Sequence, residues 1–319
     1  MGPSNGFLST IDKQGSGARR TLLWIALKFI SENNKKNTQE LTSIRSHLLL
    51  IDEPEICLHP NAIRDACNVL YDLPKTGNWQ VMVTTHSPIF IDFSRDNTTI
   101  VRVDKNTNGE VEGTTVFRPD KVQLNPDDKV NLKLLNICDP YVAEFFFGGK
   151  VLIVEGDTEY TAFNYIKVIK QQEYKNIHII RARGKATIIS LVKILNHFGS
   201  GYSVLHDSDT PLTKGGDKAN PAWGNNSNIL EAVNARPTGT KARLLCSLPN
   251  FEQAYFGEEI KIDKPYNALI TISTCSEKFD IIENLLKSLI DHNAPTPTNC
   301  FEWSTIEELK LKLEESLHT

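Results

Sequence analysis

The sequence Val151-Leu-Ile-Val-Glu-Gly-Asp-Thr-Glu-Tyr160 combines an apolar run with acidic residues and a glycine. Its first four residues are apolar and predict a buried β-strand that ends at the Glu155 carboxylate. The residues after Gly156 can open a helix, so Glu155 is expected at the carboxyl end of a strand. In an open parallel sheet this edge is where ligands bind, and a carboxylate there often serves metal or proton chemistry.

The second half of the chain continues with alternating helix and strand patterns. We expect a helix over 158–171, a strand over 177–180, a helix over 186–198 and a strand over 202–205. Together with the strand at 151–154 this is a βαβαβ order, which predicts a parallel sheet with right-handed crossovers.

Three carboxylates are expected at one edge of that sheet. Glu155 and Asp207 end separate strands, and Asp209 points to the same side as Asp207 if the strand that leads to Asp207 continues. Such hard oxygen ligands suit Mg²⁺ or Mn²⁺, and a cluster that holds two ions can cleave phosphodiester bonds. Glu159 can join this carboxylate cluster from the first turn of the following helix. The alternative is that its charge only stabilises the N-terminus of that helix through the macrodipole. The two aspartates can also be turn residues before Pro211.

Basic residues near the same edge are candidate phosphate contacts. Arg181, Arg183 and Lys185 follow the second strand, and Lys214 follows the Asp-x-Asp sequence. DNA phosphate contact is one interpretation, and a solvated charged loop is the other. The net charge of −4 argues against a basic coat over the whole protein, so any nucleic-acid site must be local.

The first half of the chain carries another pair of acids at a strand end. Residues 46–60 predict an apolar strand that ends in Asp52-Glu53, followed by a proline-containing turn. Such a strand can hold Asp52 toward Mg²⁺ and Glu53 toward an attacking water, the two tasks needed beside the terminal phosphate of a nucleotide. Another short strand, 81–85, ends at His86.

A small-residue segment precedes the first helix. Gly15-Ser16-Gly17 stands just before apolar positions that recur with helical spacing over 22–30. Small residues at a helix entrance leave backbone N–H groups that can face a phosphate. A flexible lead into the helix is the alternative.

These three segments together resemble the ABC-type ATPase head. The resemblance implies a signature loop at Gly15, Ser16 and Gly17, a Walker B pair at Asp52 and Glu53, a D-loop near Leu58-His59-Pro60 and a switch histidine at His86. No Gly-x-x-x-x-Gly-Lys-[Ser/Thr] occurs, so either a Walker A lies outside this chain or the ATPase half is degenerate. We expect ATP binding only together with a Walker A that this chain does not contain.

The acids of the second half resemble the Toprim domain of topoisomerases, primases and some nucleases, through Glu155-Gly156 and Asp207-Ser-Asp209. An ABC-type head followed directly by a Toprim domain resembles the OLD (overcoming lysogenisation defect) family of nucleases. The resemblance implies an α/β fold with the carboxyl-terminal part of an ABC-type ATPase lobe over 1–147. A Toprim domain with a Rossmann-like central parallel sheet and C-terminal helices is expected over 148–319.

The same resemblance implies the site residues and the activity. Two Mg²⁺ or Mn²⁺ ions are expected on Glu155, Glu159, Asp207 and Asp209, with Glu252 as a further candidate ligand. Glu155, Asp207 and Asp209 are the expected catalytic residues. The leading hypothesis is a metal-dependent DNA endonuclease or nickase that is controlled by the ATPase-like head. A homodimer or higher oligomer, a role in antiphage defence and a helicase or other companion protein are further expectations.

Two other functions remain open from the sequence. One is a topoisomerase-like or primase-like Toprim enzyme, although no nucleophilic-tyrosine domain is evident. The other is a non-catalytic assembly module, in which the head binds a partner and the acids hold a structural ion.

Composition sets the broad class. A length of 319 residues favours two domains, and 40% hydrophobic with 23% charged residues is ordinary for a globular protein. The six cysteines lack Cys-x-x-Cys spacing and are expected to be reduced. The apolar run 22–30 is too short to span a bilayer and has no signal-peptide layout. We therefore expect a cytoplasmic protein without a membrane partner.

The remaining segments predict supporting structure. Residues 98–117 predict a β-hairpin around Asn108-Gly109, and Phe145-Phe146-Phe147 predicts packing at a hinge into the second domain. Residues 277–291 predict an amphipathic helix, from which Lys278 or Lys287 can reach the acids or simply face solvent.

Overall fold

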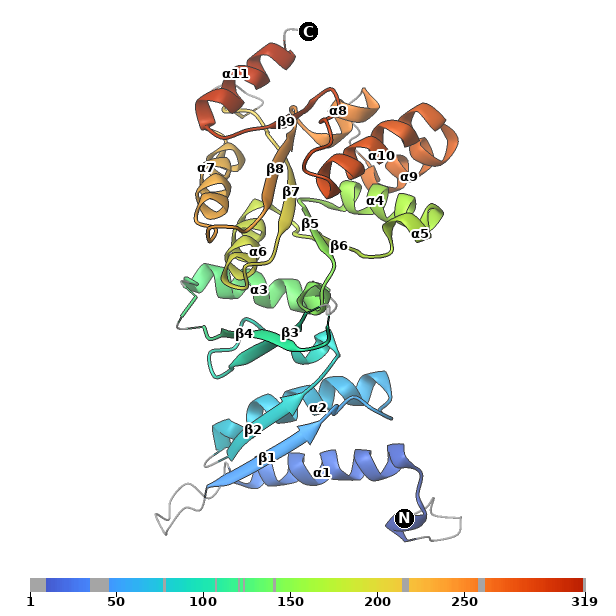
Figure 1. Ribbon diagram of the computed structural model, residues 1–319, viewed down its shortest axis with the longest axis vertical. Coiled ribbons are helices and arrows are strands. Elements are labelled where there is room, and N and C mark those ends of the chain that lie inside the picture. Colours follow the sequence, from blue (N-terminus) through green and yellow to red (C-terminus); the bar gives the residue numbers. More distant parts are fainter. Residues whose placement is uncertain are drawn as a thin grey trace. The chain divides into compact units, whose positions relative to one another are not determined.

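The computed structural model describes residues 10–34, 46–76, 79–106, 108–119, 121–122, 124–139, 142–213, 218–257 and 262–317. The chain forms two compact units, residues 1–92 and 93–319, and the predicted α/β class is confirmed (Figure 1). Compact packing thus divides the chain at 92/93. The boundary at 147/148 rests on motifs and stays a prediction.

The first unit places two helices against a two-stranded parallel sheet. Its elements are α1 (Ser16–Asn34), β1 (His47–Asp52), α2 (Pro60–Asp72) and β2 (Trp79–Thr84), with short 3₁₀ turns at Ile11–Lys13, Leu73–Thr76 and Pro88–Phe90. Trp24 and Leu27 of α1 pack on Ala66 and Leu70 of α2 in a small core. One face of each strand closes this core, as the alternation of side chains along a strand requires.

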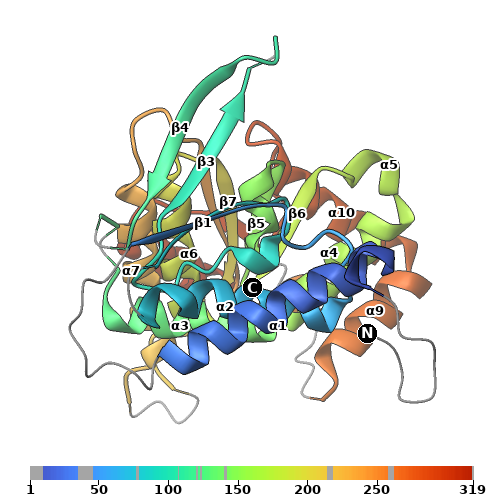
Figure 2. The same cartoon turned by 90° about the horizontal axis from the view of Figure 1, so that it is seen from below.

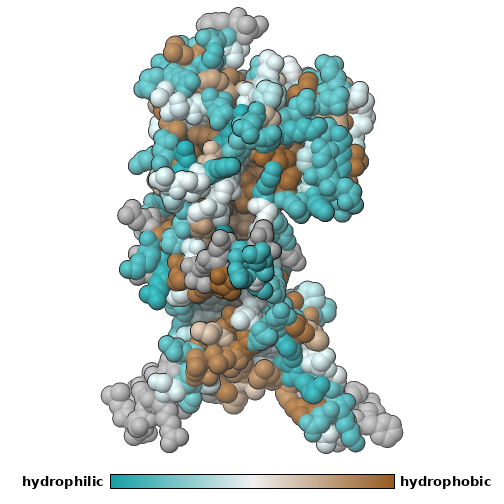
Figure 3. Space-filling model, in the orientation of Figure 1, coloured by the Kyte–Doolittle hydropathy of each residue, from teal (hydrophilic) through white to brown (hydrophobic). Residues whose placement is uncertain are grey.

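The other face of that sheet is apolar and exposed. Leu48, Leu50 and Met82 are 60%, 63% and 65% exposed, and apolar surface gathers where β1 and β2 lie (Figure 3). Parallel sheets usually have both faces covered, and exposed apolar patches of this kind mark interaction surfaces.

The second unit opens with the predicted hairpin. Strands β3 (Ile100–Lys105) and β4 (Val111–Phe117) pair antiparallel and run side by side as a twisted ribbon (Figure 2). Helix α3 (Pro126–Cys138) follows, and its Asn125/Asp128 capping box fixes its first turn. A 3₁₀ turn spans Val142–Phe147. The aromatic run predicted as a hinge lies inside this unit, because the Phe146 and Phe198 rings meet with centroids 5.1 Å apart.

A five-stranded sheet forms the centre of the second unit, in the order β6-β5-β7-β8-β9. Strands β5 (Lys150–Val154), β6 (Ile177–Arg181), β7 (Tyr202–Asp207) and β8 (Ala242–Ser247) are parallel, and β9 (Cys300–Glu302) is an antiparallel edge. The near-continuous burial along β5 and β7 is typical of parallel strands covered on both faces.

Helices cover both faces of this sheet. Figures 1 and 2 show α6 (Lys185–His197) and α7 (Pro221–Asn234) on one side, and α4 (Asp157–Ile169), α9 (Lys264–Thr274) and α10 (Ser276–Ile290) on the other. The remaining helices are α5 (Gln171–Tyr174), α8 (Phe251–Phe256) and α11 (Ile306–Leu317). The predicted βαβαβ order is confirmed. Within the described ranges, none of the helices is both long and apolar enough to cross a membrane.

Helix α4 offers a matched test of the core beneath the sheet. Ile166 is fully buried, whereas Ile169 on the same helix is 57% exposed. We expect Ile166→Ala to lower the free energy of unfolding by about 2–5 kcal/mol, because it removes buried methyl groups and leaves a cavity. Ile169→Ala is expected to stay within about 0.5 kcal/mol of wild type. Urea unfolding followed by circular dichroism measures both values, and equal losses would contradict this packing.

Candidate active site

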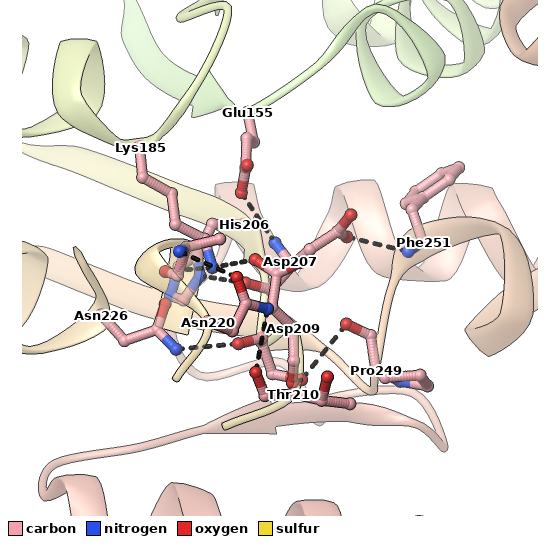
Figure 4. Close-up of polar contacts among 12 residues, drawn as sticks. Glu155, Lys185, His206, Asp207, Asp209, Thr210, Asn220, Asn226, Pro249 and Phe251 are labelled. Atoms are coloured by element: carbon pink, nitrogen blue, oxygen red, sulfur yellow. Dashed lines mark hydrogen bonds and ion pairs between the residues drawn. The ribbon is translucent and has the colours of Figure 1, made fainter. Parts of the chain in front are cut away.

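Two neighbouring strands bring the first pair of acids together. Glu155 directly follows β5 and Asp207 ends β7, and these strands are adjacent in parallel register. The backbone N–H of Asp207 donates to Glu155 Oε2 over 3.1 Å (Figure 4). The structure thus places both acids at the predicted edge of the sheet, where open α/β sheets bind ligands.

Asp207 and Asp209 are fixed in different ways. Asp207 Oδ1 accepts from the Phe251 N–H at the start of α8 over 2.8 Å. The strand ends at Asp207 and does not continue to Asp209, so strand alternation does not place the Asp209 side chain. Asp209 instead adopts a left-handed backbone conformation with φ +57°, and its N–H donates to the Pro249 carbonyl over 3.0 Å. Its place in the site is therefore set by a turn and not by strand periodicity.

Lys185 lies in a place that the sequence does not predict. It is the first residue of α6, and its side chain is only 2% exposed. Its ammonium contacts Asp209 Oδ2 at 2.5 Å and donates to the Ala222 carbonyl over 3.3 Å. Neither interpretation of the sequence, a phosphate contact or a solvated charged loop, predicts a buried ion pair at this position. The difference arises because Gly184, with φ +125°, turns the chain and directs the lysine inward.

Two further acids are buried close by. Glu159 lies in the first turn of α4 and is 3% exposed, and its Oε2 approaches Gly156 so closely that a Cβ there would lie 3.0 Å away. Glu252 of α8 accepts from Thr158 Oγ1 over 2.9 Å and pairs with Lys264 Nζ at 3.3 Å. Glu252 is thereby linked to both α4 and α9.

Burial raises the pKa values of these acids. Burial is the main cause for Asp207, whose pKa lies well above its usual range, and the charges of Glu159 and Glu155 add to it. Burial also raises the pKa of Glu159 to about 8, with contributions from Glu155 and Glu252. The pKa of Glu155 rises through burial, against the opposing charge of Lys185. The carboxylates therefore lie close enough to repel one another, which is typical of functional sites.

The donor set fits a hard divalent cation. Carboxylate oxygens are the ligands that Mg²⁺ and Mn²⁺ prefer, and a cation would relieve the repulsion between these acids. Across the described parts of the chain, no three His, Cys, Asp or Glu side chains already converge in ligand positions. In the structure, Asp207, Asp209 and Glu252 each hold a carboxylate oxygen to a protein donor.

The other cations that the sequence analysis names have different environments. Arg183 is exposed, with φ +61°. Arg181 pairs with Asp157 at 2.8 Å and covers the Tyr160 ring at 5.0 Å. Lys214 lies outside the described residues. The two lysines of the predicted amphipathic helix contact other groups. Lys278 donates to the Tyr255 carbonyl, and Lys287 pairs with Glu283.

Two buried polar residues lie beside the acids, and the sequence motifs do not identify either as a site residue. Asn226 of α7 is fully buried and donates to the Ser208 carbonyl over 2.8 Å. Its only sequence signal is an amide within a helix that is otherwise partly apolar. His206 is fully buried, as predicted for a core residue, and contacts the Trp303 ring. Burial lowers the His206 pKa to about 3, so this imidazole is neutral.

The first unit brings its predicted nucleotide-site residues into one neighbourhood. Asp52 accepts a hydrogen bond from Thr84 Oγ1, and His86 Nε2 lies 3.7 Å from Glu53 Oε1. Glu53 has a left-handed φ of +45°. Gly15 and Ser16 stand at the start of α1, as expected.

Two contacts in this unit join the signature segment to the turn after β1. A Cβ on Gly17 would lie 2.9 Å from the Cys57 carbonyl, so a side chain there would force the backbone apart. Arg20 donates to the Glu53 carbonyl over 2.8 Å. Glu55, which the motifs do not single out, accepts from Thr85 Oγ1 over 2.8 Å. Its sequence signal is its place as the last acid of the Asp-Glu-Pro-Glu run.

The raised pKa of Glu159 predicts a pH dependence of stability. The folded protein keeps a proton on Glu159 up to a pKa of about 8, whereas the unfolded chain releases it near 4.5. Stability should therefore fall as pH rises from about 4.5 to 8. With a chelator present, we expect Glu159→Gln to be more stable than wild type at pH 8 by roughly 2–4 kcal/mol and equal to it at pH 4. Urea unfolding measures this, with exposed Glu173→Gln as control; no gain at pH 8 would contradict it.

Both halves of the chain resemble known proteins. A family described as AAA ATPase domain matches residues 5–91, and the "Overcoming lysogenization defect protein-like, TOPRIM domain" family matches residues 146–209. The Old nuclease of Escherichia phage P2 is 27% identical over 203 residues, which cover 62% of this chain and 33% of that protein. The OLD nuclease of Thermus scotoductus is 28% identical over 235 residues, which cover 71% of this chain and 44% of that protein.

The chain thus spans less than half the length of either relative. Its two domains nevertheless occur in the predicted order, with the acids Glu155, Asp207 and Asp209 inside the TOPRIM match. With an AAA ATPase domain followed by an OLD-like TOPRIM domain, and with similarity to two OLD nucleases, the chain matches the OLD family of nucleases, as its motifs predict.

Proposed function

We propose that this protein is a metal-dependent endonuclease or nickase that cuts DNA at the carboxyl edge of the central sheet. The observation that carries the proposal is the meeting of Glu155 and Asp207, whose strand ends are joined by a hydrogen bond of 3.1 Å. Both relatives are named as nucleases. Acids at a strand-end edge are suited to phosphodiester cleavage when they hold divalent ions.

Four carboxylates would hold the ions: Glu155, Glu159, Asp207 and Asp209, with Glu252 as a further candidate ligand. When bound, two Mg²⁺ or Mn²⁺ ions would stabilise the attacking and leaving oxygens of the displacement. The backbone of this chain orients the carboxylates. One oxygen of Glu155 and one of Asp207 accept from backbone N–H groups, which directs the second oxygen of each carboxylate.

The DNA backbone would approach the same edge. Arg183 is exposed in the turn between β6 and α6, next to the loop that contains Glu155. Its guanidinium can pair with a phosphate in a bidentate manner. We assign Arg181 and Lys214 to the same role, Arg181 after exchange of its present partner Asp157.

The first unit would regulate the nuclease as an ABC-type head. Support comes from the convergence of Asp52, Glu53 and His86 and from the contact of Gly17 with the turn after β1. ATP would bind only together with a Walker A supplied from outside this chain. Assembly as a homodimer or higher oligomer, action in antiphage defence and a helicase or other companion belong to the same proposal.

Cleavage of supercoiled plasmid tests the nuclease. The full-length protein with Mg²⁺ or Mn²⁺ should convert the plasmid to nicked or linear forms. Glu155→Ala and Asp207→Ala should each lower the rate by roughly two orders of magnitude or more, because each removes a metal ligand. Glu173→Ala, an exposed acid of α5, should keep the wild-type rate. Intact plasmid with wild type, or unimpaired cutting by both site variants, would refute the proposal. Nucleotide incorporation or relaxation without cutting would favour a primase-like or topoisomerase-like enzyme.

The phosphate contact is tested by the salt dependence of DNA binding. Arg183→Ala should weaken binding to duplexes of any sequence and reduce the slope of log affinity against log salt by about 1. Arg236 is a matched exposed arginine that precedes β8 and thus lies at the opposite edge of the sheet. Fluorescence anisotropy with a chelator present gives both slopes. An unchanged slope for Arg183→Ala, or an equal change for Arg236→Ala, would exclude this edge as the contact.

A further inference from the structure

Lys185 is the one described lysine whose charge is enclosed within the acid cluster. Its side chain is 2% exposed, and its ammonium pairs with Asp209 Oδ2 at 2.5 Å. It also donates to the Ala222 carbonyl in the first turn of α7. A buried ammonium is strongly destabilised unless it has such partners. This lysine and this acid therefore depend on each other.

The backbone connects this lysine to the other side of the site. The Gly184 N–H donates to the Glu155 carbonyl over 3.1 Å, and the Ala182 N–H donates to the Val154 carbonyl over 2.9 Å. These two hydrogen bonds fix the turn before Lys185 to the backbone of Val154 and Glu155. The charge of Lys185 also lowers the pKa of Glu155 against the effect of burial.

A divalent cation on Asp209 would meet two obstacles. One oxygen of Asp209 is already held by the ammonium, and a positive charge lies within hydrogen-bonding distance of that oxygen. Like charges at such short range repel strongly inside a protein. A metal ion on Asp209 would therefore compete with Lys185 for the same carboxylate.

We propose that Lys185 is a positioning residue that serves as an internal counter-cation: it holds Asp209 in the site and must give up this carboxylate when a divalent ion binds. The lysine thereby sets the metal concentration at which the site fills. This inference rests on the proposed function, because it assumes that Asp209 is a metal ligand. It assigns a role to a residue that the proposed cleavage does not otherwise use.

Metal binding without DNA tests the competition. Mn²⁺ is titrated into the full-length protein, and the free ion is followed by electron paramagnetic resonance. Lys185→Met keeps the aliphatic stem and removes the charge, so we expect it to bind Mn²⁺ about tenfold more tightly than wild type. Lys193→Met is the matched control, because Lys193 lies on the same helix and pairs with a buried acid, Asp128, away from the cluster. The control should bind like wild type.

The outcomes separate this inference from the proposed function. Equal or weaker binding by Lys185→Met, beside a wild type that binds Mn²⁺, would overturn the inference alone. Absence of binding by both proteins would overturn the inference together with the metal-dependent function. Tighter binding by Lys185→Met and by Lys193→Met alike would show that the loss of any positive charge strengthens Mn²⁺ binding. That result would also overturn the inference.

A second measurement uses only the wild-type protein and holds even if Lys185→Met fails to fold. Acetic anhydride labels accessible lysines, and mass spectrometry reads the label at each position. We expect little label on Lys185 with a chelator and at least about threefold more with saturating Mg²⁺, because the ion pair with Asp209 is released. The label on Lys193 should not change. Equal labelling of Lys185 in both conditions, with Mg²⁺ shown to bind, would contradict the exchange.

Discussion

The hydrogen bond from the Asp207 N–H to Glu155 Oε2 is the contact on which the rest of the site depends. It exists because β5 and β7 are parallel neighbours whose carboxyl ends reach the same level of the sheet. The same edge receives the start of α8 through Asp207, and the turn before α6 through the Glu155 carbonyl. The sheet thus determines the site, and the surrounding helices supply the groups that orient its acids.

This arrangement concentrates negative charge at an edge of the sheet where solvent screens it only in part. Burial raises the pKa values of Glu155, Glu159 and Asp207, and the acids raise one another's further. Lys185 and Lys264 offset part of that charge through their pairs with Asp209 and Glu252. A fold gains no stability from such a cluster, and unfavourable burial of this kind is characteristic of sites that are kept for chemistry. Divalent ions would supply the missing positive charge.

The sequence predicts the framework better than the details of the site. Apolar runs and helical periodicity suffice to predict the βαβαβ order and the edge shared by Glu155 and Asp207. They cannot predict the positive-φ turn at Arg183 and Gly184, which precedes the buried Lys185, or the left-handed backbone of Asp209. Nor can they predict the partners of Glu252, which come from residues distant along the chain. Strand periodicity is a local property, whereas these contacts depend on how α4, α6, α8 and α9 pack.

We propose that the acids at the ends of β5 and β7 form a divalent metal site for phosphodiester cleavage. The most direct measurement is anomalous diffraction from crystals of the full-length protein soaked in Mn²⁺. We expect anomalous peaks at the carboxyl edge of the sheet, within ligand distance of Glu155 and Asp207 and absent after soaking with a chelator. A protein that takes up Mn²⁺ only elsewhere, or leaves this edge without a peak at saturating Mn²⁺, would contradict it.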